Sequence, residues 1–454
     1  MLYLTLSLAC TSTDSKQIDT GNQSVDTGTE TLVDCPADIS PSISSSLGCI
    51  AGKTEQDLEL FLNIPYAKPP IGENRWKRPV SPETWDTPLD GTSAGNFCVQ
   101  QSEQGIFGDE DCLNLNVIRP VDRPNNPLPI LFYTHGGSFT NGAGNEPLYI
   151  DNPRLAENAI VVTHNYRLNA FGFLGHSELT KEDEAEYGTG SSGNQGLFDT
   201  LMALEWVHEN AAALGGDPNN IMIFGESAGA ISTCALLTSP LAVGLFSSAL
   251  MQSGNCLWFP ELKTSTLYSV PAEDLGSQIA ESLGCDSEDL ACLRNKSALE
   301  IVQSLPEANY RPNVDGAFLT SHPTISLYYG NFNKVPVVAG VTGNEGSLFV
   351  HYLGIQTEEE LVEYLTEWGS NLGITDMTQL HNLYSVEEYD TPQEAFDQFY
   401  SDIIFVCPTK FLLDSVSSHV PTYAYHYTHV PSWVNYNPNF EGWGSYHSSE
   451  LPFV

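Results

Sequence analysis

The sequence predicts an α/β fold: one mainly parallel central sheet with helices on both faces. Two observations lead to this prediction. From about Cys35 onward, short apolar runs alternate with helical patterns, and neither an internal repeat nor a long Pro/Ser linker interrupts the series. Strands that alternate with helices are typical of parallel sheets covered on both faces. The length of 454 residues allows one large domain or two smaller ones.

The expected strands are apolar runs that end in small or polar residues. Six strands are expected, in residues 128–137, 158–167, 221–227, 247–253, 335–341 and 421–428. Between the second and third, residues 195–216 place Leu197, Leu201, Leu204 and Val207 on one helical face. The helix should stop at Gly215-Gly216.

Two glycine-rich segments follow strands and therefore belong at the carboxyl edge of the sheet, where α/β proteins gather functional groups. The first is the His-Gly-Gly of "YTHGGSF", and the second is "IMIFGESAGAIS", residues 221–232. In the second, Gly225 and Gly229 give the room for a sharp strand-to-helix turn that presents Ser227. A Gly-x-Ser-x-Gly match also arises by chance, so its context must support a nucleophile.

A serine nucleophile needs a base, an acid that orients the base, and donors for an oxyanion. In hydrolases with this turn, the acid and then the histidine follow the serine in the chain. The histidines after Ser227 are His322, His351, His381, His419, His426, His429 and His447. His426 and His429 fall in or beside an expected strand, whereas His447 lies in a Gly/Ser-flanked loop after the last one. The pattern favours His447 over His429 without excluding the latter.

The acid and the oxyanion donors have candidates in turns. Glu345 stands in a Gly-Asn-Glu-Gly turn beyond a strand, and Asp315 in "NVDG" is the alternative, although most Asp-Gly pairs only form turns. The donors expected for the oxyanion are the backbone N–H groups of Gly136, Gly137, Ser138 and Ala228.

The charge excludes one class of partner. With 57 acidic and 17 basic side chains, the formal net charge is −40, which argues against binding to nucleic acid. The ten cysteines form no Cys-x-x-Cys pair, and the close spacing of Cys98 with Cys112 and of Cys285 with Cys292 favours loop-closing disulfides in an oxidising compartment. Cys234 is expected to be a buried free thiol.

The first residues indicate export. Residues 1–10 form an apolar stub that resembles a bacterial lipoprotein signal ending at Cys10, which would then carry a lipid anchor. No Lys or Arg precedes the stub, and Ser7 stands where such signals usually have Leu. Residues 11–34 predict a disordered polar tether, and residues 35–454 the folded domain. An extracellular, periplasmic or outer-surface location follows.

Several blocks, taken together, resemble the type B carboxylesterases, the family that includes the cholinesterases and has the α/β-hydrolase fold. They are "FLNIPYAKPPIGENRWKRP", "EDCLNLNV", the segment 196–230, "VDGAFL", "GVTGNEGSLF" and "YHSSELPFV". The resemblance runs from about residue 50 to the last residue. Members of the family continue with further helices beyond the histidine block, which implies that this domain lacks them.

The resemblance implies a role for several residues. It implies Ser227 as nucleophile, Glu345 as acid and His447 as base, with an oxyanion hole in which Ser138 replaces a glycine. It also implies a substrate pocket that includes Trp258 and Glu226. The disulfides Cys98–Cys112 and Cys285–Cys292 and the buried ion pairs Arg75–Glu110 and Arg167–Asp199 match family positions. A disulfide between Cys35 and Cys49 is our own addition.

The resulting hypothesis is a carboxylesterase that cleaves small esters through an acyl-enzyme and needs no metal or other cofactor. The loop between Cys98 and Cys112 lacks the tryptophan of choline-binding members, which argues against a cholinesterase. The alternatives are a cell-surface binding or adhesion protein, because the family contains members without the serine, and an inactive truncated remnant. The intact triad positions favour the enzyme.

Overall fold

The structure, a computed structural model, describes residues 32–453 apart from 103, 125, 152–153, 266–269, 305–309, 437–439 and 441. The signal-like segment with Cys10 and most of the expected tether therefore lie outside the described residues.

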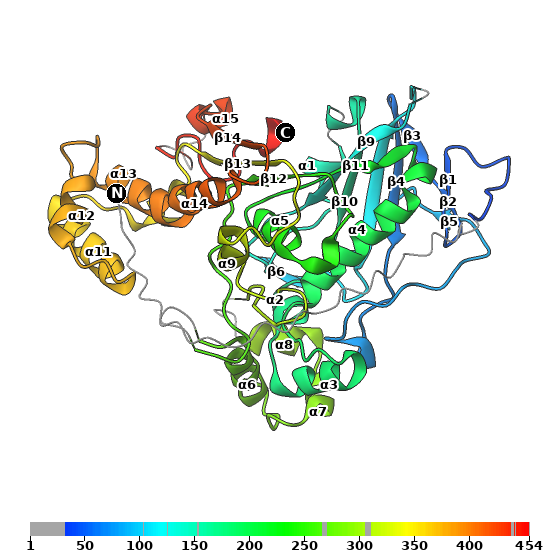
Figure 1. Cartoon of the computed structure of the whole chain (residues 1–454), viewed down its shortest axis with the longest axis horizontal. Helices are drawn as coiled ribbons and strands as arrows, with labels where there is room; N and C mark the ends of the chain where they lie inside the picture. The colour runs from blue at the N-terminus through cyan, green and yellow to red at the C-terminus, as the bar shows by residue number, and fades with distance from the viewer. Residues whose placement is uncertain are drawn as a thin grey trace. The chain divides into compact units, whose positions relative to one another are not determined.

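A nine-stranded sheet forms the centre of the fold, in the order β14-β13-β12-β11-β9-β10-β8-β4-β3 (Figure 1). Its strands are β3 (Lys53–Glu55), β4 (Leu58–Pro65), β8 (Asn114–Pro120), β9 (Leu128–Thr134), β10 (Ile160–His164), β11 (Gly216–Glu226), β12 (Ser248–Gln252), β13 (Val337–Thr342) and β14 (Thr422–Tyr427). The six strands from β14 to β10 pair in parallel, and β8, β4 and β3 pair antiparallel. The predicted mainly parallel α/β sheet is confirmed, as are its six expected strands.

Short strands form two further sheets near the N-terminal part of the described chain. The first has the order β1-β2-β5 and the second pairs β6 with β7. Their bounds are β1 (Ser42–Ser44), β2 (Cys49–Ala51), β5 (Leu89–Asp90), β6 (Gln100–Ser102) and β7 (Gly105–Phe107).

Helices complete the fold. The longer ones are α3 (Ser177–Tyr187), α4 (Gln195–Leu214), α5 (Ala228–Thr238), α6 (Ala272–Ser282), α11 (Glu358–Asn371), α13 (Pro392–Ser401) and α14 (Cys407–Val416). The shorter ones are α1 (Pro147–Ile150), α2 (Asn169–Phe173), α7 (Leu290–Arg294), α8 (Ala298–Ser304), α9 (Pro323–Tyr328), α10 (Ser347–Val350), α12 (Met377–Leu383) and α15 (Ser432–Tyr436). Among the described residues, no helix has the length and apolar character needed to cross a bilayer.

Strands inside the sheet, such as β8 and β10, are buried on both faces, to which successive side chains point in turn. In β10, Ile160 and Val162 join the main core, to which α4 and α5 contribute, while Val161 packs on the other side with Leu155 and Ile150. All five residues of β10 are buried. This explains why the strands appear in the sequence as continuous apolar runs rather than as alternating patterns.

A second hydrophobic cluster lies outside the sheet, in the segment from α10 to α13. It packs side chains such as Leu361, Leu365 and Phe396 together. Helix α11 begins with a capping box, in which Thr357 and Glu360 each bond the other's backbone N–H. A short π-helix, Asp402–Val406, then joins α13 to α14 and brings this segment to the edge of the main core.

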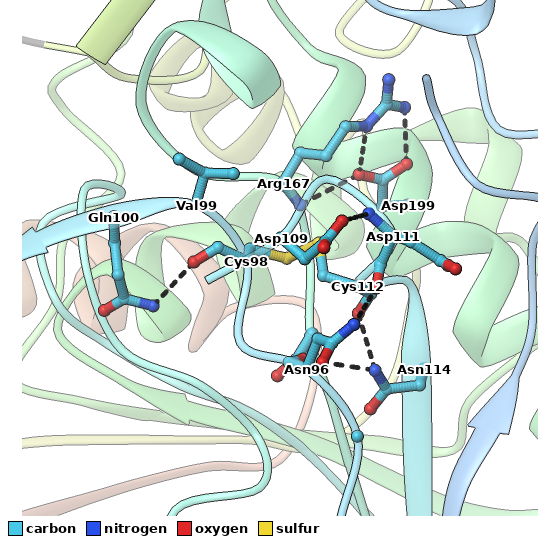
Figure 2. Close-up of a disulfide and its surroundings, with 12 residues drawn as sticks. Asn96, Cys98, Val99, Gln100, Asp109, Asp111, Cys112, Asn114, Arg167 and Asp199 are labelled. Atoms are coloured by element: carbon cyan, nitrogen blue, oxygen red, sulfur yellow. Dashed lines mark hydrogen bonds and ion pairs between the residues drawn. A yellow bond between two sulfur atoms is a disulfide. The ribbon is translucent and has the colours of Figure 1, made fainter. Parts of the chain in front are cut away.

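Among the described residues, four disulfides link eight of nine cysteines. The expected pairs Cys98–Cys112, Cys285–Cys292 and Cys35–Cys49 are all formed. Figure 2 shows the first of them, with the turn that it closes held by a hydrogen bond from the Asp111 N–H to Asp109 Oδ1 at 2.9 Å.

The expectation of a free thiol at Cys234 is wrong. Cys234 lies on α5, and its sulfur bonds to Cys256 in the loop after β12. Helix α5 packs against β12, so the two residues, 22 positions apart in sequence, meet only in the folded protein. Cys407 is exposed and is the free cysteine of the described residues.

Both expected buried ion pairs are present. Arg167 binds Asp199 through its Nε at 2.7 Å and through Nη2 at 2.6 Å, and the Arg167 backbone N–H donates to the same carboxylate (Figure 2). Arg75 binds Glu110 with a similar two-point contact. Because Asp199 is fully buried, removal of its charge leaves the Arg167 guanidinium without compensation.

We therefore expect Asp199→Asn to lower the free energy of unfolding by about 3–5 kcal/mol. Asp414→Asn is the matched control, because Asp414 pairs with Lys410 on an exposed surface of α14, where an ion pair contributes about 0–1 kcal/mol. Urea denaturation with the disulfides intact measures both values. Equal losses in the two variants would contradict the structural role of the buried pair.

Candidate active site

Ser227 lies between the end of β11 and the first residue of α5, in a strained backbone conformation. Its φ is +56° and its ψ is −120°, a combination that non-glycine residues rarely adopt. The turn is held on both sides: the Ser227 N–H donates to the Gln252 carbonyl on β12 at 2.9 Å, and the Ser227 carbonyl accepts from Ile231 at 3.1 Å. Such strain at a hydroxyl-bearing residue is typical of functional turns.

The two glycines that flank the serine are required by close packing rather than by their own φ angles. A Cβ on Gly229 would lie 1.9 Å from the Thr134 carbonyl oxygen of β9, and one on Gly225 would lie 2.5 Å from the Gly229 carbonyl carbon. No side chain fits at these distances. The helix can therefore start directly against β9, which places Ser227 beside the His-Gly-Gly loop that follows that strand.

Glu345 and His447 meet in a fully buried hydrogen bond. Glu345 lies in the turn after β13, and its Oε1 accepts from the Thr342 N–H at 2.7 Å. Its Oε2 lies 2.6 Å from His447 Nδ1. The two loops are joined by backbone pairing of Asn344 with Tyr446. This arrangement orients the imidazole, with its Nδ1–H donating a hydrogen bond to the Glu345 carboxylate.

The opposite side of the imidazole carries Nε2, which lies near Glu226, the residue before Ser227. The His447 ring packs against Phe349 and Phe405, with ring centroids 4.9 and 4.8 Å away. His447 Nε2 has no hydrogen-bond partner in the part of the chain that the structure describes, and it lies 3.1 Å from Glu226 Oε1. The two atoms are close enough for an ion pair, but they do not form a hydrogen bond. Glu226 Oε1 instead accepts a hydrogen bond from Ser448 Oγ at 2.6 Å.

Three glutamates surround this one imidazole. Burial lowers the pKa of His447, but the carboxylates of Glu226, Glu345 and Glu450 together raise it to about 9. Burial raises the pKa of Glu226. Burial, followed by the charge of Glu226, raises the pKa of Glu450 to about 8. The cluster therefore favours a positively charged His447, as long as its carboxylates remain ionised.

The loop after β9 carries the expected oxyanion donors. Gly137 has a φ of +99° and Ser138 a φ of +54°, so the loop turns sharply at both residues. Within the described residues, the N–H groups of Gly137, Ser138 and Ala228 donate no hydrogen bond. Gly136 is close to the serine turn, since a Cβ there would lie 3.2 Å from the Ser227 Cβ.

A cavity of about 250 Å³ opens beside Ser227. Its lining includes Ser138 and Ala228 of the expected oxyanion hole and also the predicted pocket residue Trp258. The residues along its wall are Ser138, Phe139, Ser227, Ala228, Ile231, Ser253, Gly254, Asn255, Trp258, Tyr310, Arg311, Phe349, Tyr400, Ile404 and Phe405. Phe349 and Phe405, which hold the His447 ring, belong to this wall, so the imidazole lies just behind it.

Glu226 differs from its expected place in the pocket. It is not among the residues that line the cavity, and its side chain is buried between His447 and Ser448. These two contacts hold the Glu226 carboxylate against the loop that carries His447. Glu226 therefore acts on the imidazole rather than on the cavity wall.

The alternative residues lie elsewhere. Asp315 accepts hydrogen bonds from the N–H groups of Ala317 and Leu319, and from Ser191, which is the role of a turn residue. His429 is exposed, next to the Phe453 ring, and His426 is exposed on β14. Neither histidine has an interaction with Glu345 among the described residues.

Sequence reasoning missed two polar groups of the site. Glu450 lies three residues after His447, and its Oε2 is buried without a hydrogen bond. Ser253, which has a φ of +50°, lines the cavity with a buried hydroxyl that also has no partner among the described residues. Glu450 is visible in the quoted histidine block, but no spacing rule links it to the imidazole.

Comparison with known proteins agrees with this geometry. The family described as the carboxylesterase family matches residues 39–454. The para-nitrobenzyl esterase of Bacillus subtilis (strain 168) is 34% identical over 432 residues, which cover 91% of this chain and 82% of the relative. The human cocaine esterase is 33% identical over 430 residues, which cover 87% and 73%.

Solved structures show the same similarity in three dimensions. A carboxylesterase of Geobacillus stearothermophilus superposes with a TM-score of 0.76 at 31% identity, covering 91% of this chain and 83% of that one. The chain therefore belongs to the carboxylesterase family, and it is a carboxylesterase with the α/β-hydrolase fold.

Proposed function

We propose that this carboxylesterase cleaves esters through an acyl-enzyme on Ser227, with His447 as general base and Glu345 as the residue that orients it. One observation carries the proposal. The imidazole bound to Glu345 packs on Phe349 and Phe405, and these two rings line the same cavity as Ser227. This packing supports a triad of the three residues, which follow β11, β13 and β14 in the chain.

In the first half of the reaction, Ser227 Oγ attacks the ester carbonyl carbon while His447 Nε2 takes the hydroxyl proton. The carbonyl π electrons move to the oxygen, which the N–H groups of Gly137, Ser138 and Ala228 stabilise. When the tetrahedral intermediate collapses, the bond to the alcohol oxygen breaks. The protonated His447 gives its proton to this oxygen, and the alcohol leaves.

In the second half, water repeats the cycle on the acyl-enzyme. His447 takes a proton from the attacking water, and the bond to Ser227 Oγ breaks with return of that proton to the serine. In this structure no hydrogen bond joins His447 Nε2 to the Ser227 hydroxyl. Catalytic hydrogen bonds of this kind often tighten only when substrate binds.

The glutamate cluster has two opposite effects on this chemistry. It stabilises the imidazolium that forms as Ser227 attacks, which lowers the barrier. It also raises the pKa of His447, so less of the neutral base is present at neutral pH. Protonation of Glu450, whose pKa is about 8, removes one negative charge and offsets part of this second effect.

We further infer that the enzyme is exported. The four disulfides favour an oxidising compartment, in agreement with the signal-like residues 1–10. A lipid anchor at Cys10 and a single catalytic domain over residues 35–454 remain our proposals for the chain's organisation.

Ser227→Ala tests the nucleophile. We expect hydrolysis of 4-nitrophenyl acetate to fall by at least about 10³-fold, because the variant cannot form the acyl-enzyme. Ser415→Ala is the control, since Ser415 is half-buried on α14 and its hydroxyl donates to the Phe411 carbonyl of the same helix. Wild type should also gain one covalent group on Ser227 after treatment with an organophosphate, as read by mass spectrometry. Similar rates in wild type and Ser227→Ala would exclude the proposal.

Glu226→Gln tests the electrostatics of the base. The negative charge of Glu226 raises the pKa of His447, so its neutralisation lowers that pKa. The base then becomes neutral at lower pH, and the acid limb of the kcat/KM profile should move down by about one pH unit or more. Asp414→Asn, far from the site, should leave the limb in place. An upward shift in Glu226→Gln would refute this account of the cluster.

A further inference from the structure

We propose that Gln100 is a positioning residue for the oxyanion hole, because its side chain binds Gly142 at two points and thereby fixes the peptide unit that carries the Gly137 N–H. This inference rests on the proposed function, since it concerns the donors of the same reaction. Gln100 is not among the described residues that line the cavity beside Ser227, so it acts through the loop that follows β9.

The first argument is the contact between the Gln100 side chain and the Gly142 backbone. The Gly142 N–H donates to Gln100 Oε1 at 2.9 Å, and Gln100 Nε2 donates to the Gly142 carbonyl at 3.0 Å. The second hydrogen of Nε2 binds the Cys98 carbonyl at 3.1 Å (Figure 2). Gln100 is buried, and its amide can form all three bonds in one orientation only.

The second argument is that Gly142 lies directly against the peptide unit between Gly136 and Gly137. A Cβ on Gly142 would lie 2.8 Å from the Gly136 carbonyl oxygen. His135 Nδ1 lies 2.8 Å from the same oxygen and must donate to it, because a carbonyl oxygen only accepts. The oxygen is thus held by two contacts. A peptide unit is planar and trans, so a fixed carbonyl oxygen also fixes the direction of the Gly137 N–H.

The third argument concerns the other donor of this loop, the Ser138 N–H. The N–H groups of Thr140 and Asn141 both donate to the Gly137 carbonyl, at 2.9 and 3.0 Å. That carbonyl belongs to the peptide unit that carries the Ser138 N–H. Because Asn141 directly precedes Gly142, the contact with the glutamine also limits the movement of these two bonds.

The fourth argument is that the segment that carries Gln100 is itself held in place. The disulfide drawn in Figure 2 closes its loop. The Val99 carbonyl, directly before Gln100, accepts from Asn169 Nδ2 at 2.8 Å. The Asn169 N–H donates to the Phe139 carbonyl at 2.6 Å, in the loop after β9. The disulfide loop is therefore joined to the loop of the oxyanion donors at two places.

The position of these donors matters because they act on the transition state. An oxyanion donor must point at the oxygen before charge develops there, and loss of one such donor costs about 10²–10³ in kcat. A donor that is displaced rather than removed costs less. Binding of the uncharged substrate makes little use of these N–H groups, so loss of the Gln100–Gly142 contact should lower kcat and leave KM nearly unchanged.

The test replaces Gln100 with methionine, which keeps the length of the side chain and removes its hydrogen bonds. For Gln100→Met, kcat with 4-nitrophenyl acetate should fall by about 10-fold, and KM should change by less than about 2-fold. Rates are expressed per active site, counted by complete titration with an organophosphate, so that loss of folded protein does not enter. Gln101→Ala is the matched control, because Gln101 is the next residue of β6 and is exposed.

A second readout separates the oxyanion from the rest of the site. In the ketone 1,1,1-trifluoro-4-phenylbutan-2-one, Ser227 Oγ adds to the carbonyl carbon, the π electrons move to the oxygen, and the serine proton passes to His447. The parent 4-phenylbutan-2-one is a much poorer electrophile and reports binding of the uncharged ketone. Gln100→Met should raise the Ki of the fluorinated ketone by about 10-fold and leave that of the parent within about 2-fold.

Equal changes in both Ki values, or an unchanged Ki for the fluorinated ketone, would overturn the proposal, as would the same effects in Gln101→Ala. If Gln100→Met does not fold, a crystal structure of the wild-type adduct decides. It should place the oxyanion about 2.7–3.1 Å from the Gly137 nitrogen, with both bonds between Gln100 and Gly142 intact, and an adduct that lacks either feature contradicts the proposal. Equal Ki values for the two ketones in wild type would instead refute the proposed function, so the two failures are distinguishable.

Discussion

The site depends on the close packing between the first turn of helix α5 and the end of strand β9. Gly229 approaches the Thr134 carbonyl so closely that a single methyl group would separate the helix from the strand. This contact accompanies the strained, positive-φ conformation of Ser227, and the His-Gly-Gly loop that follows β9 lies next to the turn. Its strain is sustained by hydrogen bonds to β12 and α5, so the central sheet itself holds the serine in place.

The electrostatics of the site follow from burial of several like charges around one imidazole. Glu345 binds His447 directly, while Glu226 and Glu450 act through space on the same ring. Burial raises the pKa of both Glu226 and Glu450, because it disfavours the charged form of each carboxyl group. The negative charges of the neighbouring glutamates raise both pKa values further. The pKa of His447 therefore depends on three glutamates, and Glu345, which orients the ring, is one of them.

The cavity joins two parts of the chain that fold around different cores. Ser227 and Trp258 come from segments next to the central sheet. Phe349, Tyr400 and Phe405 come from the segment between β13 and α14, where a π-helix turns Ile404 and Phe405 toward the main core. A change of substrate range could thus arise in the second segment, because its side chains line the cavity and do not form the strained turn.

Much of the architecture could be predicted from local pattern. The buried strands appear as apolar runs, helix α4 as a periodic stripe that ends at Gly215, and the serine turn as its two glycines. These features depend on residues that are neighbours in sequence. The local pattern favoured His447 over His429 only weakly, because it rests on the Gly/Ser-flanked loop around His447, and the resemblance decided between them.

The sequence by itself determined the mainly parallel sheet, the turn at Ser227 and the loop-closing disulfides, since each depends on backbone preference or on short spacing. Only the tertiary structure decided that Cys234 bonds to Cys256, that Glu226 and Glu450 surround His447, and that Arg311 faces the cavity. The reason is physical: these contacts join residues whose separation is set by the packing of helices on the sheet, and no local pattern encodes that distance.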